Sequence, residues 1–352
     1  MRVRSPFDTE TYVDGAPKDW QNFVDGSDLS NIFQTKLWAE AMQKAGMGTL
    51  LTLARDNQNH IKGGILGICR HSSFYGLRTI PNMQVWGGPI LYDVNDKGLA
   101  KMLLKTFEED AKKLGVISSY IRSFLPMDDI FVDKLKYTMD PSDLHCTVII
   151  DLTESTEEIW TQMQERGRRS VRKALKQGVV VEEGTTVKDY LTYYEISKKT
   201  AKRLKTTPVP LKIMMTLRET FSRENNFKLF LAKHGGHSIA GVIIARWGDK
   251  MWGWHGSSLV ESWSLNANSL IHWSIIKWGV RNHLKIYDLM GIPCRKHSSH
   301  PNYGLYLFKT QLGGRIVRHG EYLKNYFPLR YFLLSRIFRP VRSRLAKTEV
   351  TE

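Results

Sequence analysis

The segment Ile286-Tyr-Asp-Leu-Met-Gly-Ile292 is a short apolar strand pattern that carries Asp288 and runs into a glycine turn. Before it, from Asn266, apolar residues recur at the three- and four-residue spacing of a helix, at Ala267, Leu270, Ile271, Ile275 and Trp278. Further upstream, the sequence His-Gly-Gly-His separates two strand patterns, and a third follows the turn at 247–250; the three cover 227–232, 239–245 and 251–255. This part of the chain therefore predicts a hairpin, a helix and a strand in that order.

The first half of the chain shows the same order. Strand patterns at 50–54, 65–69 and 87–92 precede an amphipathic helix at 96–114, and a strand at 116–121 follows Gly115. Two successive hairpin–helix–strand units predict a duplicated α+β domain, joined near 140–143.

Composition limits the functional class. The 352 residues suggest about two domains, and 42% hydrophobic residues describe a globular protein. Lys and Arg number 51 against 35 Asp and Glu, a net charge of +16, so we expect a polyanionic partner: nucleic acid, an anionic membrane surface or a phosphorylated substrate.

Targeting signals and cysteine spacing indicate the compartment. The N-terminal sequence lacks the apolar core of a signal peptide, and no segment has the ~20 apolar residues of a membrane span. Cys69, Cys146 and Cys294 lie far apart in the sequence and have no metal-ligand spacing. We therefore expect a cytoplasmic protein, at most peripheral at the inner face of the membrane, with reduced thiols and no metal site.

Two basic helices are predicted in the middle of the chain. Ser155 and Glu158 form a capping-box pattern that opens a helix ending at Gly178. One face of that helix holds Ile159, Met163, Val171 and Leu175, and the other holds Arg166, Arg168, Arg169, Arg172, Lys173 and Lys176. A second helix ends in Lys198, Lys199, Lys202, Arg203 and Lys205. Clustered cations of this kind are typical of a polyanion site, while a merely solvated face is the alternative for each helix alone.

The C-terminal segment 326–345 alternates aromatic and aliphatic residues with arginines. It could lie on an anionic membrane as a basic amphipathic helix, or it could pack onto the first domain with its arginines in water. Both interpretations stay open.

The candidate chemistry lies in Gly304-Leu-Tyr-Leu-Phe-Lys309, shortly before Gly313-Gly314. A lysine fixed between apolar residues can stabilise a developing negative oxygen. Glycines at 291, 313 and 314 suit turns or the close approach of a ligand. The alternative is a strand pair in which Lys309 points at water.

Nine segments in a fixed order carry a resemblance to a known family. They are Phe33-Gln-Thr-x-x-Trp38, Arg169-x-Val-Arg-Lys-Ala-x-Lys-x-Gly-Val179, Tyr194…Thr200-Ala-Lys-Arg203, Ala240-Gly241, Gly256-Ser257…Glu261…Asn266-Ala-Asn268, Tyr287-Asp-Leu-Met-Gly-Ile292, Gly304-Leu-Tyr-Leu-Phe-Lys309, Gly313-Gly314 and Gly320-Glu-Tyr322. In this set the chain resembles the FemABX family of aminoacyl-tRNA-dependent peptidyltransferases, which have two GNAT-like domains. The resemblance implies a first domain at 1–143, completed by the segment 323–352, and a second at 144–322 that carries Phe308 and Lys309. The long coiled-coil insertion of some members is missing.

The resemblance implies transfer of an amino acid from aminoacyl-tRNA to an amine of a peptide or of a nucleotide- or lipid-linked cell-wall precursor. Aminoacyl-tRNA would be a co-substrate, with no cofactor and no metal. Phe308 and Lys309 would be catalytic, with Lys309 at the tetrahedral oxygen. The residues implied in substrate and phosphate binding are Arg168, Arg169, Arg172, Arg203, Lys36, Asp288 and Tyr303.

Two alternatives remain. An acyl-CoA-dependent N-acyltransferase would hold the pyrophosphate in a glycine-containing loop at a helix N-terminus, but 258–268 contains no glycine, and Gln164-x-x-Gly167-x-Arg169 departs from the pattern inside a predicted helix. The other alternative is a non-catalytic RNA- or membrane-binding protein on the same scaffold.

Overall fold

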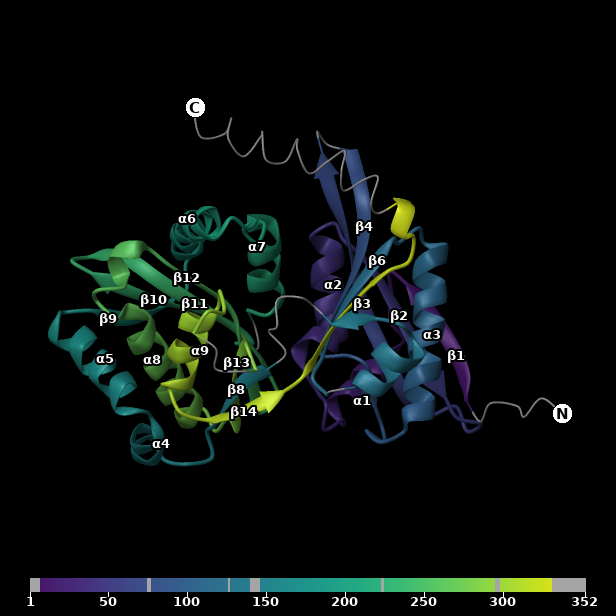
Figure 1. Cartoon of the computed structure of the whole chain (residues 1–352), viewed down its shortest axis with the longest axis horizontal. Coiled ribbons are helices and arrows are strands. Elements are labelled where there is room, and N and C mark those ends of the chain that lie inside the picture. The colour runs from purple at the N-terminus through teal and green to yellow at the C-terminus, as the bar shows by residue number, and fades with distance from the viewer. Residues whose placement is uncertain are drawn as a thin grey trace. The chain divides into compact units, whose positions relative to one another are not determined.

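The computed structural model describes residues 7–74, 77–125, 127–139, 146–222, 225–294 and 298–330. These residues fall into two compact units (Figure 1). The first unit draws on the ranges Met1–Leu29, Phe33–Asp140 and Gly320–Glu352, and the second on Ser30–Ile32 and Pro141–His319.

The first unit is built on a sheet with the strand order β1-β2-β3-β4-β6-β15-β7, with β5 beside β3. Of its described pairs, β4 and β6 run parallel and the others antiparallel. The strands are β1 (Asp8–Val13), β2 (Gly48–Arg55), β3 (Ile61–Phe74), β4 (Leu77–Trp86), β5 (Ile90–Leu91), β6 (Ser118–Ser123), β7 (Thr138–Met139) and β15 (Gly320–Asn325).

Helices cover both faces of this sheet because its strands alternate apolar side chains between the two sides. Leu50 of β2 packs in the core around α3 (Lys97–Lys113). Leu51 packs on the other side with Trp20 of α1 (Lys18–Asp25) and Ala39 of α2 (Lys36–Lys44). Short helical turns complete the unit at Ile32–Gln34 and at Asp129–Lys134. Of the first turn, Ile32 is counted with the second unit.

The second sheet has the order β14-β8-β13-β12-β11-β10-β9. Strands β12 and β13 run parallel, and the other described pairs are antiparallel. The strands are β8 (Cys146–Asp151), β9 (Val180–Gly184), β10 (Phe227–His234), β11 (His237–Trp247), β12 (Lys250–Ser258), β13 (Ile286–Ile292) and β14 (Arg315–Arg318).

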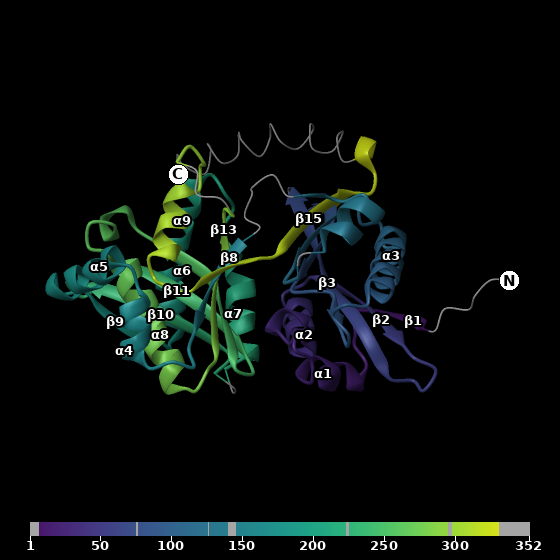
Figure 2. The same ribbon diagram turned by 60° about the horizontal axis from the view of Figure 1, so that its bottom comes forward.

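Helices also cover both faces of the second sheet, as Figure 1 shows. The larger core joins the sheet to α4 (Thr156–Gln162), α5 (Glu165–Lys176) and α8 (Ala267–Arg281). On the opposite side lie α6 (Val187–Leu204) and α7 (Leu211–Thr220). The helix α9 (Tyr303–Thr310) lies beside β13 (Figure 2), and a short turn, Val260–Ser262, precedes α8.

The predicted fold class is confirmed. In each unit an antiparallel meander ends in a strand that pairs in parallel with the strand following a helix: β4 with β6 around α3, and β12 with β13 around α8. In the described part of the chain the longest helix is α6, with 18 residues, so no long coiled-coil arm is present there. The strand β15 begins at Gly320 and pairs with β6 of the first unit. The resemblance implied that the chain rejoins the first domain at residue 323.

Some predicted elements are wrong. The strand expected at 87–92 shrinks to β5. The pattern missed β4, which contains Pro81, a residue that argues against a strand. The single helix expected after Ser155 is two helices, since Met163 and Gln164 adopt extended backbone angles. The capping box of Ser155 and Glu158 is confirmed, but Leu175 is 57% exposed rather than part of an apolar face.

The cysteine prediction is also wrong for two of the three residues. Cys146 and Cys294 form a disulfide, whereas Cys69 is not disulfide-bonded. Although 148 positions separate the bonded pair in sequence, Cys146 lies opposite Ile292 in the β8–β13 ladder. Cys294 follows two residues later, so sheet pairing brings the two together in a way that sequence spacing does not reveal.

The junction at 140–143 lies outside the described residues, as does the tail beyond residue 330.

Candidate functional site

The candidate site begins where β12 and β13 separate. The two parallel strands pair from Lys250 with Ile286 to Trp252 with Asp288. Beyond these pairs β12 continues to Ser258 and β13 to Ile292, with no further pairing between them over these described residues. Backbone groups of both strands are thereby available to other partners at this point.

Lys309 supplies such a partner. It lies in the last turn of α9, and its Nζ donates hydrogen bonds to the carbonyl oxygens of Met290 and Gly291, each at 3.1 Å. The half-buried side chain does not point at water from a strand pair, so that alternative is wrong. The structure therefore fixes an ammonium group at the carboxyl end of β13.

A backbone irregularity positions the two carbonyl acceptors. The pairing of β13 with β8 shifts between Asp288 and Gly291, and Met290 adopts a φ of 63°. The sequence predicts this turn at Gly291, but Met290 takes the unusual conformation. A non-glycine residue in this region is uncommon and costs about 1–3 kcal/mol, which the surrounding structure must offset.

Asp288 stabilises this turn. Its Oδ1 accepts a hydrogen bond from the backbone N–H of Met290 at 2.7 Å and another from the Thr147 hydroxyl on β8. The carboxylate is buried. Asp288 therefore positions the carbonyl groups that hold Lys309.

Sequence reasoning missed the partners of Phe308. The ring of His272, in α8, meets Phe308 edge-on at 5.5 Å between centroids, and its Nδ1 lies 2.8 Å from the hydroxyl of Tyr287. Tyr287 belongs to the segment that carries the resemblance, but His272 does not. In the sequence, His272 stands out only as a polar residue among apolar ones. It lies in a helix that is buried on more than one face.

Burial keeps these groups uncharged. Desolvation, with the nearby charge of Lys309, lowers the pKa of His272 to about 3. Desolvation likewise raises the pKa of Tyr287 well above its usual value of 10. Lys309 therefore lies near a neutral imidazole, which is hydrogen-bonded to a neutral phenol, so neither ring offsets its positive charge.

These shifts predict loss of stability in mild acid. The folded-state pKa is about 3 for His272 and about 4 for His255, which desolvation also lowers, against 6.5 in the unfolded chain. The unfolded state thus binds more protons below pH 6.5, and the free energy of unfolding should fall as pH falls, by about 1.4 kcal/mol per pH unit for each histidine. Urea denaturation at pH 7 and pH 5 measures this change. Equal free energies of unfolding at pH 7 and pH 5 would contradict the burial of both rings in their neutral form.

Arg203 lies at the other end of β12. Its guanidinium donates to the carbonyl oxygen of Ser258 at 3.0 Å and lies 4.8 Å from the ring centroid of Trp263. Thr200, one turn earlier in α6, donates to the same carbonyl. Arg203 thus anchors the end of α6 to the segment that leads to α8.

The other predicted binding residues lie apart. Tyr303 begins α9, and its half-buried ring stacks on Tyr306 at 6.5 Å. Lys36 belongs to α2 of the first unit, where its Nζ lies 3.9 Å from Oε1 of Glu40. The structure therefore brings Lys309, Phe308 and Asp288 together, and it places Tyr303 on the helix of Lys309.

The three arginines of α5 differ in their surroundings. Arg168 donates to the carbonyls of Thr161 and Met163, each at 2.8 Å, and pairs with Glu165, so it caps the end of α4. Arg172 lies 3.4 Å from Glu165 and stacks over Trp160. Arg169 is exposed. The outer face of α5 is thus a basic surface at Arg166, Arg169 and Lys173, whereas Arg168 has a structural task.

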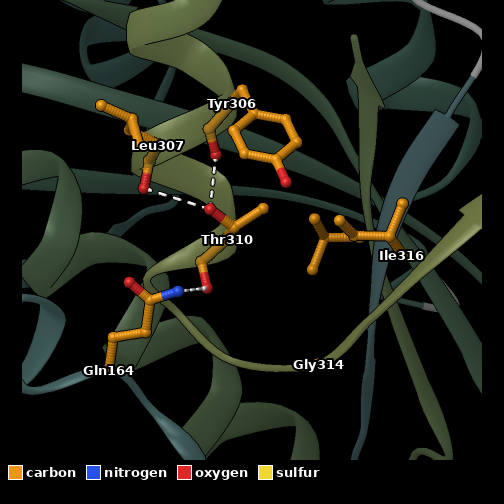
Figure 3. Close-up of a pocket in the computed structure, with 7 residues that line it drawn as sticks. Gln164, Tyr306, Leu307, Thr310, Gly314 and Ile316 are labelled. Atoms are coloured by element: carbon orange, nitrogen blue, oxygen red, sulfur yellow. Dashed lines mark hydrogen bonds between the residues drawn. The ribbon is translucent and has the colours of Figure 1, made fainter. Parts of the chain in front are cut away.

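A pocket of 260 Å³ lies beside α9 (Figure 3). Gln164 lies at the join of α4 and α5, and its Nε2 donates to the carbonyl oxygen of Thr310 at 3.2 Å. Figure 3 shows Tyr306, Thr310 and Gln164 on one side and Ile316 of β14 across from them. The remaining walls come from Val148, Leu307 and Gly314.

Comparisons with known proteins agree with this architecture. A model of the acetyltransferase (GNAT) domain matches residues 162–301. Comparison with the curated proteins found no match. The chain has a GNAT-type acyltransferase fold.

Solved structures similar to this chain extend over nearly its whole length. The crystal structure of FemX aligns with 93% of this chain and 100% of its own, at 16% identity and a TM-score of 0.70. A tandem GNAT protein from the clavulanic acid biosynthesis pathway aligns with 91% and 99%, at 9% identity and a TM-score of 0.60. The C-terminal domain of a putative lysylphosphatidylglycerol synthetase from Agrobacterium fabrum aligns with 86% and 91%, at 12% identity and a TM-score of 0.53. At these identities the similarity concerns the fold.

Over the described residues, no helix is both long enough and apolar enough to cross a membrane. Nor does that part of the chain hold a group of three or more His, Cys, Asp or Glu side chains placed to bind a metal ion.

Proposed function

We propose that this protein is an aminoacyltransferase that moves an amino acid from aminoacyl-tRNA to an amine of a peptide or cell-wall precursor. The observation that carries the proposal is Lys309, whose ammonium group is held by Met290 and Gly291 where β12 and β13 separate. The ordered resemblance to the FemABX family supports it, as does the likeness in fold to FemX along the whole of that chain.

The chemistry asks little of the protein beyond positioning and one positive charge. The acceptor amine attacks the ester carbonyl, and a C–N bond forms while the carbonyl oxygen takes up negative charge. The C–O bond to the tRNA ribose then breaks, and the proton lost by the amine ends on the departing ribose oxygen. Lys309 would stabilise the negative oxygen, and Phe308 would form an apolar wall beside it.

His272 is unsuited to act as the base in this reaction. A group with a pKa of about 3 binds a proton too weakly to take one from an amine near neutral pH. We assign it instead to packing against Phe308, next to Lys309.

The direct test uses the purified protein with tRNA charged with radiolabelled amino acids and a peptidoglycan-type peptide that bears a free amine. Parallel reactions replace charged tRNA with acetyl-CoA. Label that passes from tRNA into the peptide supports the proposal. Transfer from acetyl-CoA alone would replace it with the N-acyltransferase alternative, and binding of tRNA without any transfer would favour the non-catalytic one.

The basic face of α5 should contribute to tRNA binding. The double substitution Arg169→Glu/Lys173→Glu reverses two exposed charges, so binding should weaken at least about tenfold and depend less steeply on salt. Arg168→Ala should instead lower the melting temperature, because it removes the hydrogen bonds to Thr161 and Met163.

Filter binding at 50 and 200 mM salt, together with thermal melts, separates the two effects. Unchanged affinity in the folded double variant would place the phosphate contacts elsewhere on the protein.

A further inference from the structure

The pocket beside α9 adjoins the site of Lys309 through the sheet. Gly291, whose carbonyl holds Lys309, is paired with Thr147 of β8. The next residue, Val148, lines the pocket and is paired with Ile316, which lines it too. The pocket thus begins on β8, one strand away from the Gly291 carbonyl that accepts from Lys309. Its other side is formed by Tyr306, Leu307 and Thr310 of α9, the helix that carries Lys309.

The size of the pocket restricts its occupant. Its 260 Å³ fall below the roughly 300–1,000 Å³ of sites that enclose a whole small molecule. It therefore suits one group of a larger ligand that extends beyond it, such as a single ring system.

The lining indicates which kind of group. The ring of Tyr306 and the side chain of Ile316 offer apolar surfaces on opposite sides, and Ile316 is 45% exposed as the structure stands. The amide of Gln164 is held at the same pocket by the carbonyl of Thr310. An aromatic face for stacking and an amide with both donor and acceptor atoms are the groups that recognise a nucleobase, above all adenine.

The surroundings fit a nucleic-acid strand. Gln164 immediately precedes α5, whose exposed Arg166, Arg169 and Lys173 follow within its first three turns. A basic surface beside an aromatic pocket is the usual arrangement for single-stranded nucleic acid, with phosphates on the cations and a base on the ring.

We propose that this pocket binds the 3′-terminal nucleobase of the charged tRNA, and so places the aminoacyl ester of the same nucleotide at Lys309. This inference rests on the proposed function. The side chain of the transferred amino acid is the competing occupant, but such a side chain would not need the Gln164 amide or the adjoining basic helix.

The test measures binding of two fluorescein-labelled acceptor-stem minihelices, one with the complete CCA end and one lacking the terminal adenosine. The parent should bind the complete minihelix about tenfold more tightly, the contribution of one stacked base. In Tyr306→Leu, and in Ile316→Glu at its exposed position, the two minihelices should bind almost equally, because the pocket no longer accepts the base. Tyr92→Leu, at a 74% exposed tyrosine of the first unit, should keep the parental ratio.

Each other outcome has a distinct meaning. A tenfold ratio that persists in both folded pocket variants overturns the inference, and so does a parental ratio near one while the complete minihelix still binds. If the parent binds neither minihelix, the proposed function fails as well. Pocket variants that alter the preference between small and large transferred amino acids, with the nucleotide ratio intact, would assign the pocket to the amino acid.

Discussion

Replacing Lys309 with methionine is expected to lower kcat for aminoacyl transfer about a hundred- to a thousandfold. The charge on the tetrahedral oxygen exists fully only in the transition state, so losing the ammonium should reduce kcat more than it raises KM. The size of the effect follows the removal of a single oxyanion donor in other enzymes. Single-turnover transfer from charged tRNA measures the chemical step.

The structure adds a cost that the sequence did not indicate. Lys309 satisfies the carbonyls of Met290 and Gly291, and leaving buried acceptors without their donor costs about 1–3 kcal/mol each. Thermal melts must therefore accompany the kinetics. Lys285→Met is the matched control, because Lys285 is an exposed lysine of the same unit paired with Asp249. If folded Lys309→Met transfers within about threefold of the parent, Lys309 only ties α9 to β13.

Phe308→Leu should lower kcat for aminoacyl transfer less than Lys309→Met does, because leucine keeps an apolar wall against His272. The same single-turnover assay measures the difference.

Hydrophobic periodicity was enough to predict helices and strands within each unit, but not which strands lie next to one another in the sheets. The helix from Asn266 and the hairpin around His-Gly-Gly-His follow from local spacing and turn residues, and both are present as α8 and the β10–β11 pair. By contrast, β8 separates β13 from β14, and β15 returns to the first sheet. Such long-range pairings depend on which strand edges remain open after the meanders form, and no local pattern encodes that.

The candidate site was predicted in part, for a similar reason. Resemblance supplied Lys309, Phe308 and Asp288, which the structure brings to one end of β13. It could not supply His272, because a single buried histidine in an apolar helix looks like any core residue until its neighbours are known. Nor could it separate Arg168 from Arg169: adjacent in sequence, the first caps α4 and the second is exposed.

Gly314→Ala should be the most destabilising small substitution near the site. Gly314 has a φ of 83°, and an added Cβ would lie 2.5 Å from the carbonyl oxygen of Ile149 in β8. The backbone would have to move, yet the next residue, Arg315, is paired with that same Ile149. We expect a loss of about 4 kcal/mol or more, the range of severe core disruption.

Gly178→Ala is the matched control for this substitution. Gly178 has a φ of 75°, but an added Cβ there would meet nothing within 4 Å, so only the conformational strain of about 1–2 kcal/mol should appear. Urea denaturation of both variants separates strain from steric conflict. Equal losses would mean that β14 can shift away from β8 at little cost. In that case β14 would be too mobile to serve as a fixed wall of the pocket, and binding of a base between Ile316 and Tyr306 would lose its structural support. A loss confined to Gly314→Ala would instead show that β8 holds this wall in place, as recognition of a single base requires.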